Sequence, residues 1–338
     1  MALRSFIATV ALLALAACGD PRLPQLDLAG EAMGTTFKVS LVEAPDTLDS
    51  DALEADILAS LQRIDLLAST WREDSELSAF NADHSIDWII VSPEFCAMLD
   101  SAFTVARETG GAYDVTVGPL VNLWGFGPDG QADEPPGDDA IRAAADSVGV
   151  DLIEADCAEG LVRKDDASMY VDLSGWAKGY AVDELAELLD DTGLDNYLVE
   201  VGGEVRVSGH NSETLDWAVA IEAPSTSERL PQAVLRVTNT GVATSGDYRN
   251  FFEHSGRRYS HTIDPRTGYP VAHDLAAVTV VHPSTAYADA IATALLVLGP
   301  DDGPALAAEL DIAAYFLVRT DTEILEITSP AFDTLDTQ

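Results

Sequence analysis

The chain has 338 residues, 47% of them hydrophobic, which is enough apolar material for a sizeable core and argues against intrinsic disorder. Acidic residues outnumber basic ones by 58 to 18, so the formal net charge is −40 at pH 7. A surface this negative repels polyanions, which argues against nucleic-acid binding. It also indicates a salt-rich habitat, in which dissolved ions screen the charges.

The N-terminus is typical of a bacterial export signal. Arg4 precedes an apolar run from residue 6 to residue 17, which is too short to span a membrane. The run ends in Leu15-Ala16-Ala17-Cys18, which resembles a lipobox and predicts removal of residues 1–17 and acylation of Cys18. We therefore expect an exported protein at the periplasmic face, lipid-anchored to the inner or the outer bacterial membrane. An ordinary soluble secreted protein is the alternative.

Two further cysteines, Cys96 and Cys157, lie far apart in the sequence. In an oxidising compartment they could form a disulfide, but two separate buried thiols are an equal alternative. The sequence does not set their distance, so both readings stay open.

Hydrophobic periodicity predicts an α+β fold in a single domain from residue 28 to residue 330, with a tether at 18–27 and a tail at 331–338. Residues 71–81 are too polar for a core and are expected to form a functional loop or short helix, and residues 127–139 a surface loop. Helices are expected at 53–64, 93–109, 175–191, 285–298 and 303–310. Strands are expected at 36–42, around 152 and 161, and at 169–173, 197–201, 205–207, 218–221, 234–237, 277–281, 314–318 and 323–327.

Asp289 and Thr293 form the first candidate site. They stand four residues apart in a predicted helix, so both oxygens lie on one face. A carboxylate and a hydroxyl together suit a hard cation such as Mg²⁺. Such a pair is also common on solvated helix faces, so its weight depends on neighbouring segments.

The second candidate is the segment from Asp172 to Asp183, in which a strand ends in a polar turn that opens a helix. Backbone N–H groups at such a turn can bind phosphate oxygens. Lys178 falls in the first helical turn, where the helix dipole disfavours a cation, which suggests a phosphate or carboxylate partner. A solvated lysine is the alternative.

The third candidate is His261, in a strand that runs into a Pro/Gly turn at 265–268. It could accept a proton from an attacking hydroxyl or contact a ligand; a hydrogen-bonded turn histidine is the alternative. The glycine-rich turns at 202–204 and 245–248 match neither a dinucleotide fingerprint nor a Walker loop, and tight turns explain them equally. No Gly-x-Ser-x-Gly elbow is present, which argues against acyl hydrolysis.

Together, eight segments in colinear order resemble the ApbE family of FAD:protein FMN transferases, from Met33 to about Gly299. These segments are Met33–Phe37, Ser69–Ser78, Gly110–Leu120, Asp172–Asp183, Glu200–Glu204, Ala243–Arg249, Ser260–Gly268 and Ala288–Thr293. The resemblance implies an ApbE-like, T-fold-related architecture of mixed sheets and helices.

The resemblance also implies roles for single residues. Met33 and Trp71, where the family often has tyrosine, would flank the isoalloxazine ring of FAD. Further FAD contacts would come from Ala112, Tyr113, Asp114, Asp172, Lys178 and Ile263. Mg²⁺ would be held by Asp289, Thr293 and backbone carbonyls near Gly175 and Ala292, which explains why no dense carboxylate cluster is visible. His261 is the expected catalytic residue.

The implied reaction is a Mg²⁺-dependent transfer of the FMN half of FAD to a threonine or serine hydroxyl, with release of AMP. The implied acceptors are flavin-bearing subunits of membrane redox complexes. Two alternatives stay open. One is a periplasmic FAD pyrophosphatase, in which water accepts the FMN half. The other is a flavin-binding lipoprotein without turnover.

Overall fold

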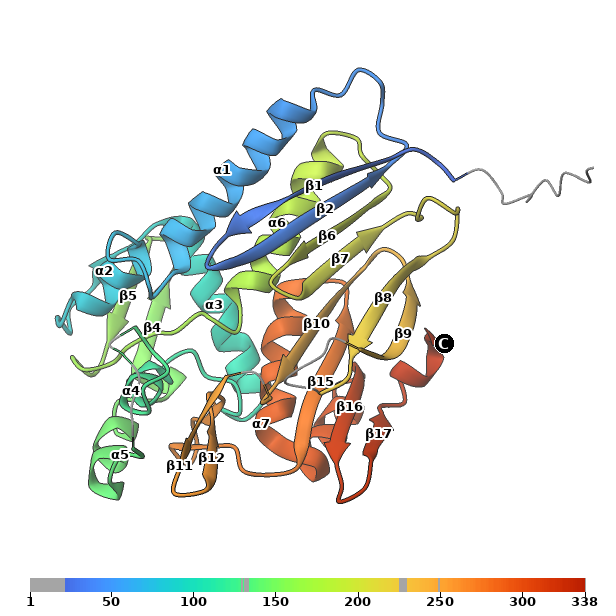
Figure 1. Cartoon of the computed structure of the whole chain (residues 1–338). Coiled ribbons are helices and arrows are strands. Elements are labelled where there is room, and N and C mark those ends of the chain that lie inside the picture. Colours follow the sequence, from blue (N-terminus) through green and yellow to red (C-terminus); the bar gives the residue numbers. More distant parts are fainter. Residues whose placement is uncertain (1–21, 129, 131–133, 225–229, 249, 338) are drawn as a thin grey trace, which may run out of the picture.

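The computed structural model describes residues 22–128, 130, 134–224, 230–248 and 250–337. The predicted leader, the predicted lipidation site Cys18 and the start of the predicted tether lie outside these residues. The fold mixes helices with antiparallel sheets, and the α+β prediction is confirmed (Figure 1). None of the helices in the described ranges is long and apolar enough to cross a membrane.

The centre of the molecule is an eight-stranded antiparallel sheet with the order β1-β2-β6-β7-β10-β15-β16-β17. Its strands are β1 (Gln25–Ala32), β2 (Thr35–Val42), β6 (Tyr197–Val201), β7 (Glu204–Ser208), β10 (Thr240–Gly246), β15 (Leu275–His282), β16 (Ala313–Arg319) and β17 (Ile324–Thr328). β6 and β7 form a hairpin in which Val201 pairs with Glu204. Gly202 and Gly203 form its turn with φ of 63° and 109°, a conformation that favours glycine.

Helices cover one face of this sheet. They are α1 (Ser50–Ala68), α3 (Pro93–Glu108), α6 (Ala177–Asp191) and α7 (Thr285–Glu309). Leucine and isoleucine side chains of α1 recur at helical spacing and pack with α6 against β2 and β6. α7 packs with α3 against β10, β15 and β16. The two helices that carry predicted site residues, α6 and α7, therefore lie side by side on the same sheet face.

The opposite face is covered by a three-stranded sheet of β8 (Trp217–Glu222), β9 (Pro231–Val237) and β18 (Asp336–Thr337). Trp217 and Leu235 of this small sheet pack against Val207 and Val281 of the central sheet. This second cover explains why β15 is buried along seven consecutive residues, since both of its faces are shielded.

Smaller elements surround one end of the sheet. They are α2 (Glu76–Ala82), α4 (Gly118–Leu123), α5 (Asp138–Ala145), the 3₁₀ turn Val150–Leu152, the sheet of β3 (Ile89–Ile90), β4 (Ile153–Asp156) and β5 (Leu161–Lys164), and the hairpins β11 (Phe251–His254) with β12 (Arg257–Ser260) and β13 (Ile263–Asp264) with β14 (Tyr269–Pro270). A second 3₁₀ turn, Phe332–Thr334, packs instead with β8 and β9 on the opposite face. Cys96 of α3 and Cys157, just after β4, form a disulfide with a Cα–Cα distance of 5.4 Å. This resolves the two readings of the cysteines.

Several predicted boundaries are wrong. β1 begins at Gln25, within the predicted tether, because it pairs with β2. The predicted tail contains β18, which pairs with β9. Residues 169–173 form no strand; Tyr170 makes a single bridge to Val117. The two C-terminal helices are one element with a kink at Gly299, where φ is 82°. Residues 76–82 form α2, and its Leu77 and Phe80 are buried, so this polar segment still contributes to the core.

Candidate active site

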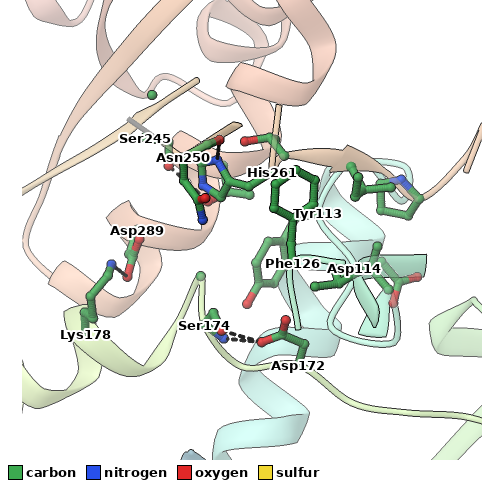
Figure 2. A pocket seen from close by; sticks show the side chains of 18 of the residues that line it. Tyr113, Asp114, Phe126, Asp172, Ser174, Lys178, Ser245, Asn250, His261 and Asp289 are labelled. Atoms are coloured by element: carbon green, nitrogen blue, oxygen red, sulfur yellow. Dashed lines mark hydrogen bonds and ion pairs between the residues drawn. The ribbon is translucent and has the colours of Figure 1, made fainter. Parts of the chain in front are cut away.

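A pocket of about 450 Å³ opens between the start of α6, the end of β10 and the second and third turns of α7, and its volume is typical of small-molecule sites. Its walls come from the loop after α3, from α4, from the turn before α6, from the β6–β7 turn, from the end of β10, from the residues that flank the β11–β12 hairpin and from the β13–β14 hairpin. Figure 2 shows side chains from these separate segments converging on one space.

Asp289 and Thr293 reach the pocket from α7, as their spacing predicted. Ser284 is the N-cap of this helix, and its hydroxyl accepts a hydrogen bond from the N–H of Tyr287. The first turn of the helix is therefore fixed close to the site. Asp289 is 3% exposed, and its Oδ2 lies 3.3 Å from the backbone nitrogen of Gly179. The hydroxyls of Thr293 and Ser245 are hydrogen-bonded at 3.0 Å.

α6 approaches α7 closely because Gly179 has no side chain. A Cβ at this position would lie 2.4 Å from the carbonyl oxygen of Thr285, a contact that no side chain tolerates. The close approach brings Lys178 to Asp289, with 3.3 Å between Nζ and Oδ2. Lys178 also forms an ion pair with Glu204 at 2.8 Å, so its ammonium group has two carboxylate partners. Figure 2 labels one of them, Asp289.

The protonation states of Lys178, Asp289 and Glu204 depend on one another. Burial alone would lower the pKa of Lys178, but Asp289 and Glu204 outweigh it and raise that pKa, so Lys178 is a cation. Burial raises the pKa of Glu204 above its usual range, and the Lys178 ammonium opposes this shift. Lys178 is therefore a cation that lies between two buried carboxyl groups.

The oxygen donors in this part of the pocket fit a divalent cation. A Cβ on Gly175 would lie 3.3 Å from the Thr293 hydroxyl, so the backbone of Gly175, Thr293 and Asp289 line a narrow cradle that a larger residue would fill. Within the described ranges, no three His, Cys, Asp or Glu side chains form a metal-binding group. A cation here would be held by one carboxylate, one hydroxyl and backbone carbonyls, a donor set of hard oxygens that suits Mg²⁺.

An aromatic and apolar wall adjoins this polar end at Tyr113, whose ring lies 3.3 Å from the position of a Cβ on Gly175. It includes Trp71, Ala112, Tyr113, Phe126 and Ile263. Trp71 is 67% exposed on the loop before α2, so its ring is free to stack on a flat ligand. The hydroxyl of Tyr113 is buried without a hydrogen-bond partner in the described chain, and burial raises its pKa.

Asp114 and Asp172 line the pocket as predicted, but their carboxylates also hold the local backbone. Asp114 accepts hydrogen bonds from the backbone and hydroxyl of Thr116 and from the N–H of Val150. Oδ1 of Asp172 accepts from the backbone and hydroxyl of Ser174, at 2.8 Å and 2.5 Å. Both residues therefore shape the loops that carry their neighbours in the pocket.

His261 has a defined tautomer. Its Nδ1 lies 3.0 Å from the carbonyl oxygen of Asn250, which can only accept, so Nδ1 carries the hydrogen and Nε2 keeps a lone pair. Burial lowers the pKa of His261, so the ring is neutral at pH 7. This imidazole lines the same pocket as Asp289 and Lys178 and can accept a proton at Nε2 (Figure 2).

The pocket brings together all the predicted site residues in the described ranges except Met33 and Ala292. Met33 packs against the helix-side core, and the Ala292 side chain is buried, which leaves Ala292 only its backbone carbonyl to offer. Sequence reasoning assigned no role to Glu204, Ser245, Asn250 or Phe126. Glu204 and Ser245 do lie in two of the segments that carried the family resemblance, but those glycine-rich turns gave no sign of which side chains point inward.

Comparison with known proteins identifies the family of this chain. Residues 33–316 match the model of the ApbE family. The FAD:protein FMN transferase of Vibrio cholerae is 40% identical over 96% of this chain and 97% of its own length, and that of Haemophilus influenzae is 41% identical over 97% and 96%. The structure of the flavin transferase ApbE from Vibrio cholerae superposes with a TM-score of 0.85 at 38% identity, covering 93% of this chain and 99% of that one. The apo flavinyl transferase ApbE of Pseudomonas stutzeri gives 0.85 at 37% identity, over 93% and 97%. The chain belongs to the ApbE family.

Proposed function

We propose that the protein is a FAD:protein FMN transferase that moves the FMN half of FAD to a threonine or serine hydroxyl of a partner protein and releases AMP. The observation that carries this proposal is that a neutral histidine and a buried oxygen-rich cradle face one pocket. The relatives that match nearly the whole chain are named FAD:protein FMN transferase.

Asp289, Thr293 and the backbone carbonyls of Gly175 and Ala292 are the groups that would hold Mg²⁺. Bound there, Mg²⁺ would offset the negative charge of the FAD pyrophosphate, which a protein of net charge −40 otherwise repels. Lys178 lies beside this cradle and supplies a fixed positive charge for a phosphate oxygen.

The apolar wall suits the flavin ring. Trp71 offers an exposed aromatic face, and Tyr113 and Phe126 line the interior. With the ring against this wall and the phosphates toward Lys178, FAD spans the pocket from its aromatic side to its polar side.

His261 is placed to assist the acceptor. In the proposed reaction the acceptor hydroxyl oxygen bonds to the FMN phosphorus, the bond from that phosphorus to the bridging oxygen breaks, and AMP leaves with that oxygen. The hydroxyl proton passes to Nε2 of His261, which carries a lone pair because Nδ1 holds the ring hydrogen and donates it to the carbonyl oxygen of Asn250.

We further propose that the protein is exported and anchored by a lipid on Cys18, and that its acceptors are flavin-bearing subunits of membrane redox complexes. The disulfide between Cys96 and Cys157 supports export, because disulfides persist in oxidising compartments. The apolar run at residues 6–17 followed by Cys18 supports lipidation.

The test is to incubate the protein with FAD, Mg²⁺ and a candidate acceptor domain, then to measure acceptor mass and AMP. We expect an FMN-sized adduct on threonine or serine with AMP released, and loss of both with chelator or with Asp289→Ala. AMP and free FMN without an adduct would support a pyrophosphatase. Bound FAD with neither product would support a flavin carrier.

A further inference from the structure

We propose that Glu204 is a positioning residue that draws Lys178 away from Asp289 and so frees Asp289 to bind the divalent cation. This inference rests on the proposed metal site. It assigns a role to a buried carboxylate that is not among the proposed metal ligands.

Glu204 and Asp289 share a single ammonium group. Lys178 Nζ lies 2.8 Å from Oε1 of Glu204 and 3.3 Å from Oδ2 of Asp289. Each carboxylate residue is only 3% exposed, so water does little to solvate either charge. Without a bound cation, Lys178 is therefore the counter-charge of both carboxylates.

The buried position of Glu204 carries a free-energy cost, which points to a functional role for this carboxylate. Its Oε2 is buried and has no hydrogen-bond partner in the described part of the chain, although Glu204 lines the pocket. A buried acceptor without a partner costs free energy, so this oxygen favours the approach of a donor. The Lys178 ammonium, already on Oε1, has further N–H groups with which to engage it.

The β6–β7 turn holds the lysine in place. A Cβ on Gly202 would lie 3.1 Å from Cδ of Lys178, so the lysine stem runs directly over this turn. Glu204 is the first residue of β7, immediately after Gly202 and Gly203. The turn therefore fixes the stem of Lys178, and a small displacement of its ammonium changes the balance between the two carboxylates.

A cation at Asp289 must compete with Lys178. The two positive charges repel each other, so Lys178 must leave Asp289 as the cation binds. Glu204 provides the alternative partner, and it is already the nearer of the two carboxylates. If Glu204 were neutral, Lys178 would pair with Asp289 alone and would compete with the cation.

The test is a double-mutant cycle in which Mn²⁺ or Mg²⁺ affinity is measured by calorimetry without FAD. The proteins are the wild type, Glu204→Gln, Lys178→Met and the double variant. We expect Glu204→Gln to weaken binding more when Lys178 is present than in the Lys178→Met background, by about tenfold, as is typical of groups in contact. We also expect Lys178→Met alone to bind the cation more tightly than the wild type.

Equal losses in both backgrounds would overturn the inference, because Glu204 would then act on the cation by its charge alone. A wild type that binds no cation would overturn the proposed metal site itself. Glu200→Gln is the matched control: Glu200 accepts a hydrogen bond from the N–H of Gly203 on the same turn but does not line the pocket, so its loss should leave cation affinity unchanged. Thermal melts test whether each variant is folded.

A crystal structure of the Mn²⁺-bound wild type gives an independent measurement that needs no variant. We expect Lys178 Nζ to remain within hydrogen-bonding distance of Glu204 and to lie beyond 4 Å from Asp289. An ammonium still bound to Asp289 beside the metal would contradict the inference.

Discussion

Asp183 on α6 accepts a hydrogen bond of 3.0 Å from the hydroxyl of Ser284, the N-cap residue of α7. The same carboxylate accepts from the backbone N–H groups of Thr285 and Ala286, at 2.9 Å and 3.0 Å. A side chain of one helix thus caps the next, and it fixes the position of Asp289 and Thr293 relative to Lys178.

We expect Asp183→Ala to lower the free energy of unfolding by about 2–4 kcal/mol, because it leaves the α7 N-terminus and Arg206 without their shared carboxylate. It should also weaken Mg²⁺ binding, since the two helices lose their common anchor. Urea unfolding and calorimetric titration measure the two effects. Asp190→Asn is the control: it weakens a hydrogen bond from Tyr197 to the same helix, away from the pocket, and should not change Mg²⁺ affinity. A folded Asp183→Ala protein with normal Mg²⁺ affinity would contradict this positioning role.

We expect His261→Gln to lower the rate of FMN transfer by about 10²- to 10⁴-fold, the usual contribution of a general base. FAD binding should be retained, because glutamine can still donate to the Asn250 carbonyl. Rapid-mixing kinetics and a separate FAD titration distinguish transfer from binding. If both FAD affinity and transfer fall in proportion, His261 contributes to binding and not to proton transfer.

The pH dependence of transfer follows from the same residue. Burial lowers the pKa of His261 from its ordinary value of about 6.5, and only the neutral ring can accept a proton. The rate should therefore be independent of this group above pH 6.5 and should fall as pH decreases through the lowered pKa. A pH profile of kcat/KM measures this acid limb, which should be absent from His261→Gln. An identical limb in the variant would assign the titration to another group.

We expect Trp71→Ala to weaken FAD binding by about 3- to 10-fold, from the loss of one aromatic stacking contact. Stability should change by less than about 0.5 kcal/mol, because Trp71 is 67% exposed. Fluorescence titration with FAD and thermal melts measure the two. Trp88→Ala removes another part-exposed tryptophan, 41% exposed and outside the pocket, and should leave FAD affinity unchanged. Equal effects of the two substitutions would rule out stacking at Trp71.

Reduction of the disulfide should destabilise the protein. The bridge joins residues 61 positions apart, and closing a loop of this length stabilises a fold by up to about 4 kcal/mol. Dithiothreitol should lower the melting temperature of the wild type but not that of the Cys96→Ala, Cys157→Ala double variant. A melting temperature that is unaffected by reductant in the wild type would show that the bridge does not form in solution.

The sequence determined those features that depend on local periodicity and local turns. The four-residue spacing of Asp289 and Thr293 placed both on one helix face, and the polar turn before α6 placed Lys178 in its first turn. The resemblance of colinear segments indicated the family, which the comparisons confirmed.

Only the tertiary structure decided which distant segments meet. Glu204 joins Lys178 and Asp289, Asp183 caps α7, and Cys96 reaches Cys157, although nothing in their local patterns signals these partners. Periodicity records which face of an element is buried, but not what covers it. Those contacts arise from packing α6 against α7 through Gly179 and from pairing strands that are far apart in the chain, so they follow from the whole fold.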